Sequence, residues 1–287
     1  MPKLSLVICI HGDRDFLSRL LAHSTGCYDE LLVIHDGPDF QDVESLVKSR
    51  GGRFYSRPRS FSQEALLPFA LENAAHDWII RFDADEFPSS ELRSWLLDFR
   101  QSAPPQNVAC YRCVVPMWDG RKTLTKRWPN RLFLVDRRRA RVIGMPEMGI
   151  IPDGSRVTVP LILHHQPARR SHGLSNILRE PRAIAYRKLI AQSLLAPPLS
   201  LNCWRYTDQG WPGTWSAAAR RPLFTGIRHL FELPVRQFAS MIRAGEWPRP
   251  SGFLHAGIFH FLTCLEVWKL RRAQRQTEEP PVSAQEK

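Results

Sequence analysis

The alternation of short apolar runs with amphipathic segments over the first 82 residues is the feature that most restricts the fold of this chain. Four runs have the composition of β-strands, and the segments between them place apolar residues at helical spacing. Strands separated by helices favour a parallel sheet with helices on both faces. Ligands of such sheets bind beyond the carboxyl ends of the strands. The four runs are LSLVICI at 4–10, LLVIHDG at 31–37, GRFYS at 52–56 and DWIIRF at 77–82.

The pattern changes after Asp83. A helix is expected over residues 89–100, and the β-type runs that follow, up to His165, predict a smaller antiparallel or mixed part that completes the sheet. From His172 onward the spacing is mainly helical. We therefore expect an α/β domain over 1–168, a basic helical extension over 169–275 and a disordered tail over 276–287.

The positive charge is concentrated in the second part of the chain. Residues 166–287 carry 18 Lys and Arg against 8 Asp and Glu, whereas residues 1–165 carry 22 against 20. This asymmetry fits nucleic acid, an anionic membrane surface or a phosphate-bearing substrate, and equally a solvated basic face. No run reaches the roughly 18 apolar residues that a membrane-spanning helix needs. Residues 252–272 instead predict a two-faced helix that packs on the core or lies on a bilayer.

The cysteines and the first residues bear on the cellular compartment. Six cysteines in 287 residues are too sparse for the disulfide framework of a small secreted domain. Cys110 and Cys113 form a C-x-x-C without a second pair at zinc-site spacing, so buried thiols are expected in preference to a metal or redox site. The chain begins directly with a strand and lacks the features of a signal peptide. We expect a cytoplasmic protein.

The strongest local signal is WIIRFDADEF, an apolar strand that ends in three carboxylates. Asp83, Asp85 and Glu86 repel one another unless a cation lies among them. Oxygen ligands in a small cluster suit Mg²⁺ or Mn²⁺, so the cluster predicts a divalent metal that would also hold phosphates. The competing interpretation is a helix N-terminus, where acidic residues are favourable ahead of a helix near Ser89.

A second acidic turn, VIHDGPDF, ends the second strand. In a parallel sheet Asp36 lies at the same edge as Asp83 and Asp85, so both groups can face one ligand. The carboxylate of Asp36 can accept hydrogen bonds from a base or a ribose. Taken alone, D-G is also an ordinary turn.

In their order along the chain, these motifs resemble the inverting family 2 glycosyltransferases of GT-A fold, especially the bacterial subgroup that builds lipopolysaccharide core and related glycans. The resemblance extends through RWPNRLFLVDRRRARVIGMPE and VPLILHH to the C-terminal segment from ELPVRQF to LEVWKL. It implies a GT-A-like α/β fold, with a mostly parallel sheet flanked by helices and a C-terminal helical extension. It also implies transfer of a sugar from a nucleotide-sugar donor to a glycan or glycolipid acceptor of the cell envelope.

The resemblance implies a role for four carboxylates. Asp83 and Asp85 would hold a divalent metal, Mg²⁺ or Mn²⁺, bound to the diphosphate of the donor. Asp36 would contact the nucleoside. Glu147 would be the base that takes the proton of the acceptor hydroxyl as its oxygen attacks the anomeric carbon.

Further contacts and partners follow from the same resemblance. His165, or its neighbour His164, would add a metal or diphosphate contact, although each is as readily a buried strand histidine. Arg131 would approach the phosphates, which a guanidinium matches. The implied partners are a nucleoside-diphosphate sugar and a glycan or glycolipid acceptor. Independently of the resemblance, a basic surface with Trp and Phe residues suits peripheral contact with the anionic inner face of the cytoplasmic membrane, and no nucleic acid is expected as a partner.

Three other functions are open from the sequence. The chain departs from the family pattern at Leu67, Pro68 and Pro146, which fits a GT-A-fold partner protein without activity. A haloacid-dehalogenase-type phosphotransferase also uses a D-x-D after an apolar strand, but its pattern has Thr where this chain has Phe87. A nucleic-acid-binding protein would use the basic, tryptophan-bearing C-terminal region and would leave the acidic cluster unexplained.

Overall fold

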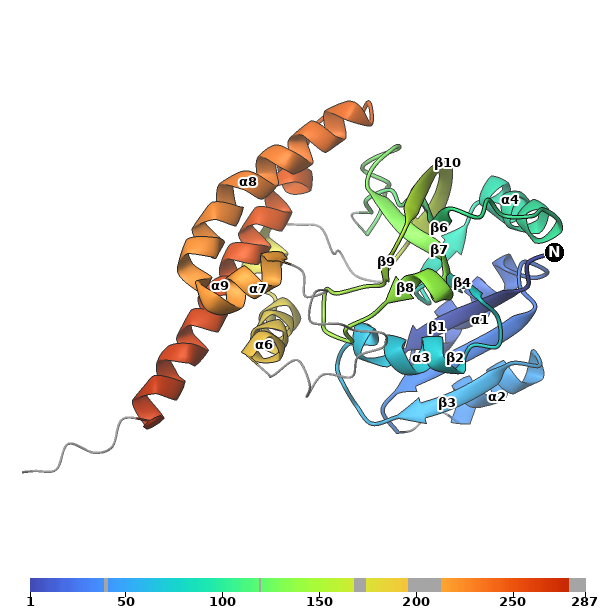
Figure 1. Cartoon of the computed structure of the whole chain (residues 1–287), viewed down its shortest axis with the longest axis horizontal. Helices are drawn as coiled ribbons and strands as arrows, with labels where there is room; N and C mark the ends of the chain where they lie inside the picture. Colours follow the sequence, from blue (N-terminus) through green and yellow to red (C-terminus); the bar gives the residue numbers. More distant parts are fainter. Residues whose placement is uncertain (39–40, 119, 168–173, 196–212, 279–287) are drawn as a thin grey trace, which may run out of the picture. The chain divides into compact units, whose positions relative to one another are not determined.

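The computed structural model describes residues 1–38, 41–118, 120–167, 174–195 and 213–278 (Figure 1). The chain divides into two compact units, the first made mainly of residues before 174 and the second mainly of the helices that follow. The functional division at residue 168 that the sequence suggested stays a prediction.

One eight-stranded sheet forms the centre of the first unit, in the order β3-β2-β1-β4-β7-β6-β10-β5. The pairings among β1, β2, β3 and β4 are parallel. β7 lies antiparallel between β4 and β6, and β10 is parallel to β6 and antiparallel to β5. The expected fold class, a mostly parallel sheet flanked by helices with a mixed part completing it, is confirmed. The strands are β1 (Leu4–Ile10), β2 (Glu30–Asp36), β3 (Arg53–Arg57), β4 (Trp78–Arg81), β5 (Glu86–Pro88), β6 (Val108–Val114), β7 (Asn130–Asp136) and β10 (Ser155–His165), with β8 (Ala140–Arg141) and β9 (Ile151–Pro152) pairing separately.

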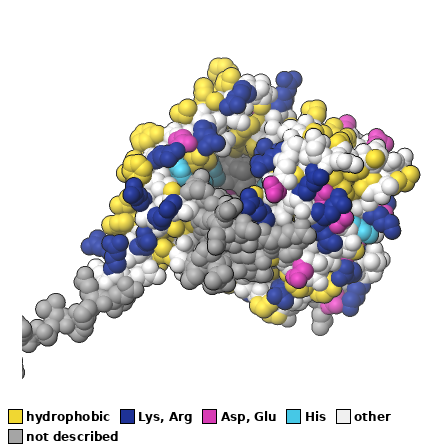
Figure 2. All heavy atoms as spheres, viewed as in Figure 1, with side chains coloured by type: hydrophobic (Ala, Val, Ile, Leu, Met, Phe, Trp, Pro, Cys, Tyr) yellow, Lys and Arg dark blue, Asp and Glu magenta, His cyan; other side chains and the backbone are white. Residues whose placement is uncertain are grey.

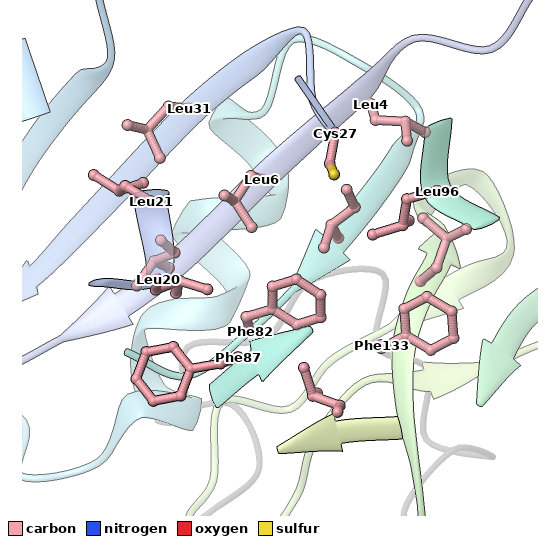
Figure 3. Close-up of a cluster of buried hydrophobic side chains, with 14 of the residues drawn as sticks. Leu4, Leu6, Leu20, Leu21, Cys27, Leu31, Phe82, Phe87, Leu96 and Phe133 are labelled. Carbon is pink, nitrogen blue, oxygen red and sulfur yellow. The ribbon is translucent and has the colours of Figure 1, made fainter. Parts of the chain in front are cut away.

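Helices cover both faces of this sheet. Apolar side chains of α1, α2 and α4 join the core on one face, and those of α3 join the core on the other. Figure 3 shows side chains on the first of these faces converging, among them Leu20, Phe82, Leu96 and Phe133. The helices are α1 (Arg14–His23), α2 (Gln41–Ser49), α3 (Leu67–Asn73) and α4 (Ser90–Gln101), with short 3-10 turns η1 (Gln63–Leu66) and η2 (Arg137–Arg139).

The central strand shows why the sequence folds in this way. All seven residues of β1 are buried, as a strand with helices on both faces requires, and this explains its unbroken apolar run. Cys9 on β1 and the four other described cysteines are free and buried, so the expected buried thiols are confirmed for these five. Burial raises the pKa of the Cys9 thiol to about 12. Cys203 lies outside the described residues.

The second unit is helical, as the spacing after residue 172 predicted. Its longest helix, α9, contains the expected helix at 252–272 and buries Thr263, Cys264 and Val267. α9 ends at Glu278, inside the segment expected to be disordered, and the rest of that segment lies outside the described residues. None of the described helices is long and apolar enough to cross a bilayer. The described helices are α5 (Leu174–Arg179), α6 (Pro181–Leu195), α7 (Gly213–Arg220), α8 (Pro222–Arg243) and α9 (Pro250–Glu278).

Candidate functional site

The acidic motif after β4 meets the first residues of β7 because of the strand register. β4 and β7 are antiparallel, with Ile80 opposite Leu134. Asp83, three residues after Ile80, therefore meets Arg131, three residues before Leu134. Arg131 Nη2 lies 2.6 Å from Asp83 Oδ2, and Arg131 Nη1 pairs with Glu86. One guanidinium therefore lies between two of the three carboxylates.

Glu86 and Arg81 complete this charged cluster. Glu86 is fully buried, and its Oε2 accepts the backbone N–H of Asp83 at 2.8 Å. Arg81 Nη2 lies 3.6 Å from Asp83 Oδ1 on the other side. The repulsion that the sequence predicted among the carboxylates is thus relieved in part by two arginines, and the carboxylate of Asp85 lies outside these pairs.

The cluster separates the acidities of its two innermost carboxyl groups. Burial acts to raise the pKa of Asp83, but the positive charges of Arg131 and Arg81 outweigh it, so that this pKa lies well below its ordinary value. Burial raises the pKa of Glu86, and Arg131 offsets only part of this effect while the Asp83 carboxylate adds to it. Asp83 is therefore the ionised partner of Arg131, and Glu86 titrates closer to neutrality.

The pairing of β5 with β10 brings His165 to Asp85. Glu86 lies opposite His165 in this register, and the backbone N–H of Gln166 donates to the carbonyl of Asp85 at 2.9 Å. His165 Nε2 lies 3.4 Å from Asp85 Oδ2. Burial acts to lower the pKa of His165, but the Asp85 carboxylate raises it above the ordinary histidine value.

His164 lies on the other side of the strand. Side chains alternate along a strand, so His164 and His165 face opposite ways. Burial lowers the pKa of His164, and the charges that act on it are those of Glu91 and His23, not those of the acidic cluster. Of the two histidines that the sequence left open, His165 is therefore the one beside Asp85.

The side chains of Asp85 and His165 are suitable ligands for a divalent cation whose other ligands come from elsewhere. Asp85 and His165 offer one carboxylate and one imidazole whose nearest atoms lie 3.4 Å apart. Adjacent ligands lie about 3 Å apart in an octahedral shell with bonds of about 2.0–2.1 Å. Within the described part of the chain, no set of three or more His, Cys, Asp or Glu side chains is grouped to hold a metal by itself. Asp85 and His165 could therefore hold a cation only together with further ligands, which phosphates and water would have to supply.

Asp36 lies at the end of β2 and organises the loop after β3. Its Oδ1 accepts the N–H and the hydroxyl of Ser60 at 2.6 and 2.7 Å. Its Oδ2 accepts the N–H of Phe61 at 3.1 Å and lies 3.0 Å from Arg59 Nη1. Phe61 has a φ of 61°, which a non-glycine residue adopts only where its surroundings hold it. The carboxylate of Asp36 thus fixes the loop that borders this edge of the sheet.

A pair of histidines joins the ends of β1 and β2 beside this loop. The backbone N–H of Gly12 donates to His35 Nε2 at 2.9 Å, and His11 Nδ1 lies 2.9 Å from the carbonyl oxygen of Asp36. His35 is fully buried, and burial lowers its pKa to about 4, with the nearby His11 contributing in the same direction. His35 is therefore neutral near pH 7, with Nε2 as an acceptor.

Glu147 lies in an exposed turn after Pro146, with a φ of 63°. The same turn approaches the charged cluster two residues later, where Gly149 lies beside the guanidinium of Arg81. Arg81 in turn lies beside Asp83. The turn that carries Glu147 therefore borders the acidic cluster.

The structure brings together most of the residues that the sequence singled out. Asp83, Asp85, His165 and Arg131 form one cluster, while Asp36 lies at the end of β2 at the same edge of the sheet. Sequence reasoning missed four residues whose contacts shape this edge. A detectable signal was their position, because each lies at the carboxyl end of a parallel strand or in the first residues after it: Arg81, His35, Arg59 and Ser60.

Comparisons with known proteins give distant likenesses of fold. No family model and no curated protein matches the chain. Among solved structures, S. aureus TarS is 10% identical with a TM-score of 0.38 over 92% of this chain, which spans about half (54%) of the TarS chain. TarS 1–349 in complex with UDP-GlcNAc gives 11% identity and a TM-score of 0.41, over 96% of this chain and 92% of that one.

A third likeness is to glucosyl-3-phosphoglycerate synthase from Mycobacterium tuberculosis, in complex with Mn²⁺, UDP-glucose and glycerol 3-phosphate. It is 14% identical with a TM-score of 0.44, over 67% of this chain and 79% of that one. With TM-scores below 0.5, these likenesses assign no function to this chain.

Proposed function

We propose that this chain is a metal-dependent, inverting glycosyltransferase of the family 2 type. It would move a sugar from a nucleoside-diphosphate sugar to a glycan or glycolipid acceptor in the synthesis of lipopolysaccharide or another cell-envelope polysaccharide. The observation that carries the proposal is the pair formed by Asp85 and His165 at 3.4 Å, beside a carboxylate cluster that two arginines neutralise in part. The motifs that resemble this family contribute both residues.

The cluster provides both a cation site and a rigid support for it. Asp85 and His165 would hold a divalent cation, which when bound offsets charge on the departing diphosphate. Asp83, which the resemblance also assigns to the metal, is paired with Arg131 and Arg81, so in this proposal it supports the site. Arg131 is engaged by Asp83 and Glu86, so it holds the motif in place and adds positive charge near the phosphates. Fixed charges of this kind need little reorganisation when the leaving group develops its charge.

The carboxyl ends of β1 and β2 would bind the nucleoside. In this proposal, Asp36 and the loop that it holds at Ser60 and Phe61 shape the pocket for the base and ribose. Neutral His35 keeps the backbone of Gly12 in place at the neighbouring strand end. Ligands of parallel sheets bind at this edge.

Glu147 is the proposed base. Its carboxylate would take the proton of an acceptor hydroxyl while the oxygen of that hydroxyl attacks the anomeric carbon. The bond between this carbon and the diphosphate oxygen breaks on the opposite face, so the configuration inverts. The exposure of Glu147 supports this role, because an acceptor must reach the base from solvent.

The test is binding of UDP, GDP, CMP and TDP and their sugar conjugates by calorimetry, with and without Mn²⁺. We expect one nucleotide to bind only with the metal, and Asp85→Ala to weaken that binding at least 30-fold and abolish transfer. Asp98→Ala is the matched control, because it removes an exposed carboxylate from α4 outside the cluster.

The outcomes separate the alternatives. Metal-dependent binding without turnover on any acceptor would indicate a partner protein that has kept the fold. Binding of nucleic acid without nucleotide binding would favour the basic C-terminal region as the functional part. A phosphoenzyme trapped at Asp83 would favour the phosphotransferase. Equal binding by Asp85→Ala and the unmodified chain would overturn the metal site.

A further inference from the structure

Helix α8 carries a stripe of exposed apolar side chains along one side. The residues recur at intervals of three and four, so they project from one face of the helix. Their exposed fractions run from 46% to 69%, which is unusual for side chains of this size in contiguous order. We name this surface the α8 stripe, and it consists of Phe224, Ile227, Phe231, Val235, Phe238 and Ile242.

The α8 stripe is not the side by which the helix packs into its own unit. The opposite side of α8 buries Thr225 and His229. Gly226 approaches Cys264 of α9 so closely that a Cβ at position 226 would lie 2.9 Å from the Cβ of Cys264. The helix therefore already has a packing face, and the stripe is a second apolar face.

Arginines line one flank of the stripe. Arg221, Arg228, Arg236 and Arg243 are exposed and follow the stripe at helical spacing. The only carboxylate of α8 is Glu232, and it is paired with Arg228 at 2.7 Å and Arg236 at 3.4 Å. A shallow groove runs over both kinds of side chain, from Phe224 to Arg236. Figure 2 shows hydrophobic side chains along the outer edge of α8 with Lys and Arg side chains beside them.

We propose that the α8 stripe docks on an anionic lipid bilayer. An apolar face bordered by cationic side chains is the pattern of a helix that lies in the plane of a membrane interface, with its apolar side chains among the acyl chains and its cations at the headgroups. The Phe, Ile and Val side chains of the stripe form the apolar side, and the four arginines are the cations at the headgroups. A helix of 22 residues is about 33 Å long, so the contact is extended.

Charge decides between a bilayer and a second copy of the chain. Two copies joined through the stripe would bring two rows of arginines together, and Glu232 is already engaged within its own helix. Like charges at close range disfavour that contact. An anionic lipid surface instead complements the arginines. The inference stands apart from the proposed transferase activity, since it depends only on α8.

The experiment is co-sedimentation of the full chain with vesicles of phosphatidylcholine alone and of phosphatidylcholine with 30% phosphatidylglycerol. We expect binding to the anionic vesicles that weakens at least tenfold in 0.5 M NaCl, and little binding to the neutral ones. Phe231→Glu should weaken binding to the anionic vesicles at least tenfold. Leu178→Glu is the matched control, because Leu178 is an exposed apolar residue of α5 outside the stripe and the change of charge is the same.

Thermal unfolding of each variant shows whether it folds. If Phe231→Glu does not fold, Arg228→Gln with Arg236→Gln tests the cationic flank and should weaken anionic binding. Sedimentation of the unmodified chain with neither vesicle overturns the inference, and so does equal loss in Leu178→Glu. A dimer in analytical ultracentrifugation that Phe231→Glu dissociates, without vesicle binding, would assign the stripe to a second copy instead. The readout is sedimentation, so a chain without transferase activity can still pass or fail it.

Discussion

Arg131 Nη2 lies 2.6 Å from Asp83 Oδ2, and the other terminal nitrogen of the same guanidinium pairs with the fully buried Glu86. This arrangement makes Arg131 a support of the acidic motif, because both ends of its planar fork are engaged inside the protein. The sequence had suggested a contact with phosphates for this residue. A phosphate that approaches the cluster would meet a guanidinium already fixed in position by two carboxylates.

Arg131→Leu is expected to destabilise the chain by about 3 kcal/mol. The substitution removes the cation that Asp83 and Glu86 share and leaves only Arg81 beside Asp83. Removal of one partner of a buried pair costs about 3–5 kcal/mol. Urea unfolding followed by circular dichroism measures the change. The double variant Arg131→Leu with Glu86→Gln should recover at least 1 kcal/mol, because a neutral amide at position 86 no longer needs the cation. Equal stability of the single and double variants would show that Glu86 does not depend on Arg131.

Glu147→Gln is expected to lower the transfer rate by a factor of about 10² to 10⁴, the usual contribution of a general base. Affinity for the nucleotide, measured by calorimetry with Mn²⁺, should stay within twofold, because the amide has nearly the same shape. Glu72→Gln on the exposed side of α3 is the control for loss of a surface carboxylate. Loss of nucleotide affinity together with the rate would assign Glu147 to donor binding instead.

The fold could be predicted from the sequence where the information is local. The apolar run of β1 and the helical spacing that follows it suffice for the parallel half of the sheet. The position of β7 between β4 and β6 could not be predicted, because pairing between strands distant in sequence leaves no local trace. The contact of Arg131 with Asp83 depends on that pairing, so it could not be predicted from the sequence either.

The candidate site shows the same division. Asp83 and Asp85 were recognisable because carboxylates at the end of an apolar strand are chemically costly. The choice between His164 and His165 needed the antiparallel register of β5 and β10, which sets the face of each side chain. On the surface, the helix expected at 252–272 exists, but it buries Thr263, Cys264 and Val267 and leaves the apolar face that the spacing predicted only half-buried. Among the described residues, a long exposed apolar stripe lies instead on α8, and spacing alone does not show which face of a helix is covered.

His35, buried near the carboxyl end of β2, is expected to make the stability of the chain depend on pH. Burial lowers the pKa of His35 from 6.5 to about 4, so between these values the unfolded chain binds a proton that the folded chain does not. The free energy of unfolding is therefore about 3 kcal/mol higher above about pH 6.5 than below about pH 4, and this stability is lost as the pH falls between the two values. His35→Gln keeps an acceptor for the N–H of Gly12 and removes the titration.

The measurement is the free energy of unfolding in urea at pH 7.5 and at pH 4.5 for both proteins. The difference in stability between the two pH values should be smaller in His35→Gln than in the unmodified chain by about 2–3 kcal/mol. Comparison of the two proteins cancels the contributions of the other titrating groups. Parallel pH profiles would show that His35 does not carry this dependence.

The contact between Gly257 and Pro234 should make the second unit sensitive to a single methyl group. A Cβ at position 257 of α9 would lie 2.7 Å from ring carbons of Pro234 in α8 and 3.1 Å from the carbonyl oxygen of His229. Gly257→Ala gains about 1 kcal/mol of helix propensity, but overpacking at such distances costs about 1–3 kcal/mol. We therefore expect a net loss, read as a lower midpoint of thermal unfolding.

Removal of the Pro234 ring tests whether this close approach causes the loss of stability. In a Pro234→Ala background the ring carbons that meet the new methyl are gone, so Gly257→Ala should be neutral or stabilising there, by its propensity alone. The coupling between the two substitutions isolates the contact from the effect of either residue on its own helix. If Gly257→Ala lowers stability equally in both backgrounds, the carbonyl of His229 rather than the proline ring limits the approach of α9 to α8.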